Sequence, residues 1–329
     1  YKRQDLSYMY SKSDGEYTDS RIYGDSIFDQ NWLTGSCEGT TTSIRGVPCV
    51  DIPWLDPELL RGNVSPEVAE FLFGFDTGTT EYTQWSVDGY VTGDLFELPA
   101  GTVAAAIGFH YREDEIVDTP GPDTLAGNDW NGEAAGITAG DDATTALFAE
   151  FDIPLLADLP AVQNLTLNAS GRWTDVDSYG DDYTWKVGIN WQIIDSLRFR
   201  ANKGTSFRTP ALYELYLADS TGFISQRSDP CIQYEAQFLA GNISENNYQN
   251  CLADPANLPP DYGGPSVTPT VFTGGGLGEL EAETSDSFTA GFIWQPSFIE
   301  LSVALDYFDF EVNDQVSQLG GERIIVLCY

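Results

Sequence analysis

The sequence predicts an all-β protein, an antiparallel transmembrane β-barrel whose strands run up and down with long extracellular loops. Polar and apolar residues alternate in runs of ~10–13 residues, aromatic residues gather near the ends of these runs, and the connections between them are short and long in turn. A tilted strand of ~9–11 residues spans a bilayer, whereas strands average ~5–6 residues in soluble sandwiches. The run lengths therefore favour a membrane barrel over a soluble sandwich.

The clearest alternation lies in the neighbouring runs 164–174 and 183–193. Odd-numbered positions are apolar in both, as at Leu167, Trp173 and Trp185, and even-numbered positions are mostly polar. A helix would repeat its apolar residues at intervals of three and four, so both runs are predicted to be strands. Less regular runs are 82–92, 101–112, 144–153, 197–207, 284–294 and 300–311, with 1–10 and 18–28 as weaker candidates.

The connections between these runs predict which end of the barrel faces outward. Outer-membrane barrels have short periplasmic turns and long outer loops. Here every long connection falls on the same side of the membrane, and a soluble fold has no reason to follow that rule. In chain order the connections are 93–100, 113–143, 154–163, 175–182, 194–196, 208–283 and 295–299.

Two short helices are expected in the outer segments. Ser65 followed by Pro66 has the residues of a helix N-cap and first turn, and Gly74 is expected to end that helix. Thr209 and Pro210 are expected to start a helical turn that runs through Tyr216.

The composition excludes several classes of function. With 51 acidic and 15 basic residues the formal net charge is −36, which is incompatible with binding nucleic acid through its phosphates. No apolar run approaches the ~18 residues of a transmembrane helix. His110 is the only histidine, and the sequence lacks the common catalytic and phosphate-binding motifs. We therefore expect no enzyme activity, cofactor or metal, and we expect the acidic segments 113–115 and 141–142 to be solvated loops rather than Ca²⁺ sites.

The five cysteines lie in segments rich in Gly, Asn, Asp and Pro, away from the predicted strands. Two disulfides within loops, Cys37–Cys49 and Cys231–Cys251, are the simplest assignment, and they imply an oxidising compartment. Cys328 is then unpaired, and we expect its partner to lie outside this chain.

The segment that follows 197–207 carries a family motif. Phe207, Arg208 and Pro210, followed by Glu214 and Leu215, resemble the Phe-Arg-x-Pro and Glu-Leu motif of TonB-dependent receptors. Further resemblances occur in the family's order on the predicted hairpins. They are 93–101 followed by Tyr111-Arg112, then 149–154, then 280–285, 291–296 and 306–308.

The resemblance implies a receptor of the bacterial outer membrane that imports a nutrient ligand: a ferric siderophore, an oligosaccharide or a peptide. Its implied partners are TonB and outer-membrane lipid, including lipopolysaccharide. A passive porin or a structural barrel is the alternative. The family also has a plug domain and a barrel of about 22 strands. We therefore expect residues 1–329 to be a partial barrel without the plug and the C-terminal strands.

Basic residues gather on the polar parity of the central strands, which is predicted to face the lumen if the apolar parity faces lipid. Pairing with the plug, or with Glu150 and Asp152 on the wall, is favoured over ligand contact for these residues. His110 shares the parity and is expected to be an ordinary hydrogen-bonded lumen residue. The basic residues are Arg112, Arg172, Lys186, Arg198 and Arg200, and the candidate ligand contacts are Arg112, Arg198, Arg200, Tyr213 and Tyr216.

Overall fold

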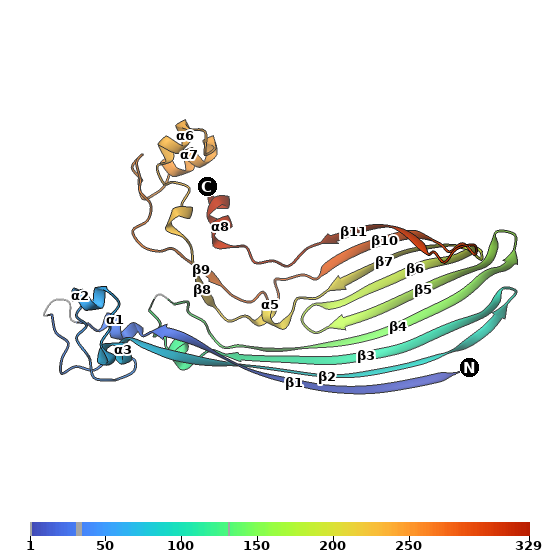
Figure 1. Ribbon diagram of the computed structural model, residues 1–329, viewed down its shortest axis with the longest axis horizontal. Coiled ribbons are helices and arrows are strands. Elements are labelled where there is room, and N and C mark those ends of the chain that lie inside the picture. The colour runs from blue at the N-terminus through green and yellow to red at the C-terminus, as the bar shows by residue number, and fades with distance from the viewer. Residues whose placement is uncertain (1, 31–34, 131) are drawn as a thin grey trace.

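A computed structural model describes residues 2–30, 35–130 and 132–329 and is dominated by one curved antiparallel sheet (Figure 1). Its nine strands follow the order β1-β2-β3-β4-β5-β6-β7-β10-β11, while β8 and β9 form a separate two-stranded sheet. This up-and-down meander confirms the predicted fold class. The strands of the sheet are β1 (Arg3–Ile22), β2 (Phe73–Leu98), β3 (Gly101–Thr119), β4 (Thr138–Leu159), β5 (Val162–Val176), β6 (Gly180–Ile194), β7 (Leu197–Arg208), β10 (Glu283–Trp294) and β11 (Val303–Asn313).

Most strands extend beyond the runs that the sequence predicted. β3 continues to Thr119, so the acidic segment 113–115 lies in a strand and not in a loop as predicted. Residues 141–142 likewise lie in β4. Successive side chains still point to opposite faces of the strand there, but both faces carry polar residues. This suits a part of the barrel wall that extends beyond the membrane into water.

The first and last predicted strands also differ from the structure. β1 joins the first weak candidate, 1–10, to the start of the second, 18–28, but the chain turns into helix α1 (Gly24–Phe28) before that second run ends. At the other end β11 begins at Val303, so the start of the run 300–311 lies outside the strand.

The register of the ladder places the apolar parity on one face of the sheet. Trp173 faces Tyr183 across β5 and β6, and Leu165 faces Trp191 near the opposite ends of those strands. At ~3.4 Å per residue the strand between these two pairs is about 27 Å long, close to the ~25 Å apolar band of outer-membrane barrels. The other face carries polar pairs such as Ser170 with Lys186.

The connections confirm the predicted division between short turns and long loops. The helices gather toward the end of the sheet away from the short turns (Figure 1). None of the helices in the described ranges has the length and apolar character that a membrane span requires. The helices are α1, α2 (Pro57–Leu60), α3 (Pro66–Leu72), α4 (Pro122–Leu125), α5 (Leu212–Tyr216), α6 (Tyr234–Leu239), α7 (Glu245–Leu252) and α8 (Gly321–Cys328), with a 3-10 turn at Gln226–Ser228. The two-stranded sheet consists of β8 (Ser220–Phe223) and β9 (Thr270–Thr273).

Both predicted short helices are present with altered ends. The Ser65 hydroxyl accepts a hydrogen bond from the Val68 amide at 3.4 Å, which confirms Ser65 as the N-cap of α3. Gly74 does not end this helix, because the chain passes from Leu72 directly into β2. α5 begins at Leu212, slightly later than Thr209-Pro210 suggested.

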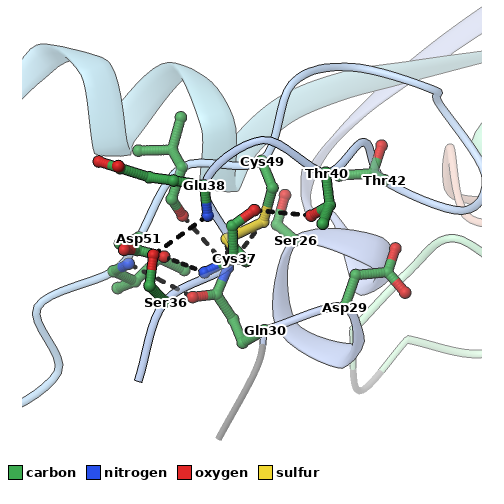
Figure 2. The surroundings of a disulfide bond; sticks show 12 residues. Ser26, Asp29, Gln30, Ser36, Cys37, Glu38, Thr40, Thr42, Cys49 and Asp51 are labelled. Carbon is green, nitrogen blue, oxygen red and sulfur yellow. Dashed lines mark hydrogen bonds between the residues drawn. A yellow bond between two sulfur atoms is a disulfide. The ribbon is translucent and has the colours of Figure 1, made fainter. Parts of the chain in front are cut away.

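The segment between β1 and β2 has a small core of its own, built around the predicted Cys37–Cys49 disulfide (Figure 2). The amide of Gln30 lies 3.6 Å from each sulfur and donates to the Val50 carbonyl at 3.2 Å. The disulfide is therefore the centre of a folded unit and not an isolated staple. The apolar side chains buried with it are Ile52, Val68, Phe71 and Leu72.

The segment between β7 and β10 contains the second predicted disulfide, Cys231–Cys251, buried against Tyr234. The residues after β11 pack onto this unit: the Tyr329 hydroxyl donates to Asp254 at 2.7 Å. Cys328 is exposed and is a free thiol within the described chain.

Candidate functional site

The polar face of the sheet is hollowed beneath α5. A cavity of about 640 Å³ opens there, and strands β2 to β7 and the residues around α5 line it. Because its lining belongs to the polar parity, the cavity lies on the face that a closed barrel would turn toward its lumen. The acidic and basic lining residues are His110, Arg112, Asp114, Asp142, Arg172 and Arg208.

Asp114 is the centre of one hydrogen-bond network in this cavity. It accepts from Arg112 Nε at 2.7 Å, from the Tyr82 hydroxyl at 2.8 Å and from Gln84 Nε2 at 2.6 Å. Its exposed fraction is only 5%. The prediction of a solvated loop at this position was wrong, because residues 113–115 lie in β3. All three side chains are acidic, so the alternation of polar and apolar residues does not mark the strand there.

The other acidic and imidazole groups of the cavity are also paired. His110 Nδ1 lies 2.6 Å from Asp88 Oδ1, which agrees with the expectation that His110 is a hydrogen-bonded lumen residue. Asp142 accepts from the Ser178 amide at 3.0 Å and from its hydroxyl at 2.6 Å. These contacts fix the wall and leave the cavity's carboxylates occupied.

The family motif anchors the long segment that carries α5. Arg208, the last residue of β7, donates to both carboxylate oxygens of Glu214 in α5, at 2.9 and 3.3 Å. It also donates to Glu283, the first residue of β10, at 2.7 Å. Phe207 stacks on Tyr179 with ring centroids 6.3 Å apart, and Leu215 is buried.

The electrostatics of Glu214 follow from this anchor. The hydrogen bonds from Arg208 lower the pKa of the Glu214 carboxyl below its usual 4.5, and the hydrogen bond from the Ala211 amide lowers this pKa further. Burial raises the pKa, but by less than the hydrogen bonds lower it. Glu214 therefore holds α5 as a carboxylate at neutral pH.

Two of the candidate ligand contacts meet in the cavity, Arg112 and Tyr213. Tyr213 is 53% exposed and also lines a neighbouring cavity of about 590 Å³. Tyr216 instead fastens α5 to the sheet, because its hydroxyl donates to the Asp141 carbonyl at 2.8 Å.

The remaining two candidates lie elsewhere on the wall. Arg198 donates to Gln192 at 2.7 Å in a separate hollow beside the short turns. Arg200 binds both oxygens of Asp306 on β11, at 2.9 and 3.0 Å. Wall pairing was thus correctly expected for Arg112 and Arg200, but their partners are Asp114 and Asp306 and not the predicted Glu150 and Asp152.

Within the described residues, no group of three or more His, Cys, Asp or Glu side chains is arranged to hold a metal ion. The chemistry that the cavity offers is hydrogen bonding, charge pairing and aromatic contact.

Comparison with known proteins shows which family the chain resembles. Residues 1–326 match the family described as "TonB dependent receptor-like, beta-barrel". The vitamin B12 transporter BtuB of Photobacterium profundum is 34% identical over 65 residues, which are 20% of this chain and 11% of that protein.

Two solved structures are similar in fold. The siderophore receptor PirA from Acinetobacter baumannii aligns with 95% of this chain and 32% of its own, at 13% identity and a TM-score of 0.49. A mutant ferric enterobactin receptor from Pseudomonas aeruginosa, PfeA, in complex with enterobactin, aligns with 93% of this chain and 32% of its own, at 17% identity and a TM-score of 0.45. The chain spans about a third of the length of these structures. From the family match, which covers nearly every residue, we conclude that the chain belongs to the TonB-dependent receptors of the bacterial outer membrane, within their β-barrel.

Proposed function

We propose that this chain is part of the wall of a receptor that binds a nutrient ligand between its outer loops and upper lumen and imports it in a TonB-dependent step. Membership of the TonB-dependent receptor family is the observation that carries the proposal. The fold supports it, since the long segments gather at one end of the sheet and α5 covers a lumen-side cavity there.

Within the cavity we propose Arg112 and Tyr213 as ligand contacts. Tyr213 presents an exposed ring where two cavities meet, and aromatic rings bind both sugars and aromatic groups. Arg112 retains donors beyond the one that Asp114 takes. Arg200 and Tyr216 are weaker candidates, because hydrogen bonds within the wall already engage them. Arg198 is weaker because it lies in the separate hollow beside the short turns.

The proposed partners follow the same division of the sheet. The apolar parity would contact outer-membrane lipid and lipopolysaccharide, and TonB would act through segments of the receptor outside this chain. Ferric siderophores, oligosaccharides and peptides are the ligand classes that we propose to test. The family match favours this receptor over a passive porin.

The test is uptake by the full-length receptor, expressed in cells that lack their own receptors of this family, with and without TonB. The probes are a ferric catecholate complex, a maltohexaose and a mixture of short peptides, each radiolabelled. We expect uptake of one class that requires TonB and is reduced by Tyr213→Ala but not by Tyr183→Ala, an exposed tyrosine on the apolar parity. Uptake of small solutes that is independent of TonB and unselective would instead identify a porin.

A further inference from the structure

Arg172 is a half-buried cation of the lumen-side cavity, and no carboxylate among the residues that the structure describes forms an ion pair with it. It lies on β5 between Phe148 of β4 and Thr184 of β6. Its Nε donates to the Thr174 hydroxyl at 3.1 Å, and its guanidinium carbon lies 6.0 Å from the centre of the Phe148 ring. These two contacts orient the guanidinium and leave both Nη groups without a protein acceptor in the described part of the chain.

The other arginines of this cavity are neutralised. Arg112 has Asp114, and Arg208 has Glu214 and Glu283. Arg198 also lacks an ion pair among the residues that the structure describes, but it lies in a different hollow beside the short turns.

The carboxylates near Arg172 are already engaged. Asp88, which attracts it at longer range, is bound by His110. Asp114 is bound by three donors, and Asp142 by two from Ser178. In a chain with 51 acidic and 15 basic residues, a half-buried arginine with no carboxylate partner in the described ranges is therefore unexpected.

We infer that Arg172 binds an oxyanion that enters the lumen-side cavity. Withholding a guanidinium from water without a counter-ion is unfavourable, and its two Nη groups match the paired oxygens of a carboxylate, a phosphate or a catecholate. The oxyanion belongs either to the imported ligand or to a side chain of a receptor segment outside this chain. The first source rests on the proposed import function; the second requires only that the barrel closes around that segment.

The experiment uses the full-length receptor purified in detergent, with Arg172→Gln, Arg172→Lys and the control Arg227→Gln, which changes an exposed arginine outside the cavity. Isothermal titration with inorganic phosphate and with citrate measures oxyanion binding, and thermal unfolding measures stability. If the site is open to ligand, we expect Arg172→Gln to weaken binding by about tenfold to a hundredfold, the range for a lost charge-assisted hydrogen bond. Arg172→Lys should lose less, and Arg227→Gln should leave binding unchanged.

If a carboxylate of the receptor itself binds Arg172, neither probe binds the unaltered protein, and Arg172→Gln lowers the melting temperature more than Arg172→Lys or Arg227→Gln. The inference is overturned if Arg172→Gln matches Arg227→Gln in both measurements. TonB-dependent uptake, measured on the same variants, separates the proposed import function from the proposed oxyanion site. If Arg172→Gln behaves like the control but uptake persists, the oxyanion site is refuted and the import function is not.

Discussion

The guanidinium of Arg208 binds the carboxylate of Glu214 with both Nη atoms, at 2.9 and 3.3 Å, and reaches Glu283 with one of them at 2.7 Å. Arg208 ends β7, Glu214 lies in α5 and Glu283 begins β10. One side chain therefore joins the two ends of the segment 209–282. The family motif thus acts here by anchoring that segment beside the cavity.

Replacing Glu214 with Gln should loosen α5 without unfolding the sheet. The variant loses the charge of a partly exposed pair, which is worth about 1 kcal/mol, and weakens the contact with the Ala211 amide. Amide hydrogen exchange of the full-length receptor should show faster exchange in 209–282 and unchanged exchange in β3 to β6. The matched control is Glu235→Gln, an exposed glutamate in α6. Equal exchange in both variants would contradict an anchoring role for Glu214.

The same pair predicts a dependence on pH. The pKa of Glu214 is lowered in the folded protein, chiefly by hydrogen bonds from Arg208, so its contribution is complete above the ordinary glutamate value of 4.5. It is lost as the pH falls from 4.5 through the lowered folded pKa. Proteolysis of 209–282 by an acid-active protease should therefore accelerate below pH 4.5, and Glu214→Gln should be fast at every pH. An unchanged acid response in Glu214→Gln would assign the effect to other carboxyls.

Breaking the Cys37–Cys49 disulfide should unfold the segment between β1 and β2 but leave the sheet intact. The model of restricted loop entropy gives a loss of about 3 kcal/mol for a loop of this size, and Gln30 and the surrounding apolar side chains lose the group they pack against. In Cys37→Ser/Cys49→Ser, limited trypsin digestion should cut at Arg45 or Arg61 faster than in the unaltered receptor. Cys231→Ser/Cys251→Ser serves as the control, since it should leave those two sites protected.

Asp25 should be among the least replaceable residues of the same segment. Its exposed fraction is 1%, and it binds the Arg45 side chain and the Arg45 amide, both at 2.9 Å. Burial acts to raise the pKa of Asp25, but the hydrogen bonds from Arg45 and Thr42 outweigh burial and lower it. Asp25→Asn leaves Arg45 in a mostly buried place without a counter-charge, which costs about 3 kcal/mol or more.

The measurement for Asp25→Asn is local stability by hydrogen exchange within 23–72. Glu38→Gln removes one negative charge from an exposed place in the same segment and is the control. A loss of protection that is no greater in Asp25→Asn than in Glu38→Gln would show that the buried pair does not stabilise the segment.

The sequence predicted the sheet well because a barrel wall is periodic. In every strand, apolar residues alternate with polar residues on the opposite face. Leu167 and Trp173 therefore show which side chains of β5 share the apolar face, even when its neighbouring strands are not known. The ends of the strands were predicted poorly. Above the membrane both faces are polar, and hydrophobicity no longer distinguishes a strand such as 113–119 from a loop.

The candidate site was only partly predictable, because the partners of a lumen residue come from distant strands. Parity placed Arg112 and Arg200 on the polar face of the sheet, where they form ion pairs. It could not identify Asp306, which reaches Arg200 only because β10 and β11 follow β7 after the insertion of 209–282. Likewise, α5 is visible in the sequence, whereas the cavity beneath it depends on how Arg208 and Glu283 fix the inserted segment.

The assignment of the two faces predicts opposite effects for neighbouring positions on β5. Ala169 pairs with Phe151 and Val187 on the apolar parity, and Ser170 pairs with Glu150 and Lys186 on the polar parity. Near the middle of the apolar band an arginine facing lipid costs about 2–4 kcal/mol, whereas lumen positions accept charge. Ala169→Arg should therefore reduce the yield of folded full-length receptor in lipid vesicles, measured by the shift in gel mobility between unheated and heated samples. Ser170→Arg should fold nearly as well as the unaltered protein, and if instead it were the more damaging of the two, the lipid and lumen faces assigned here would have to be exchanged.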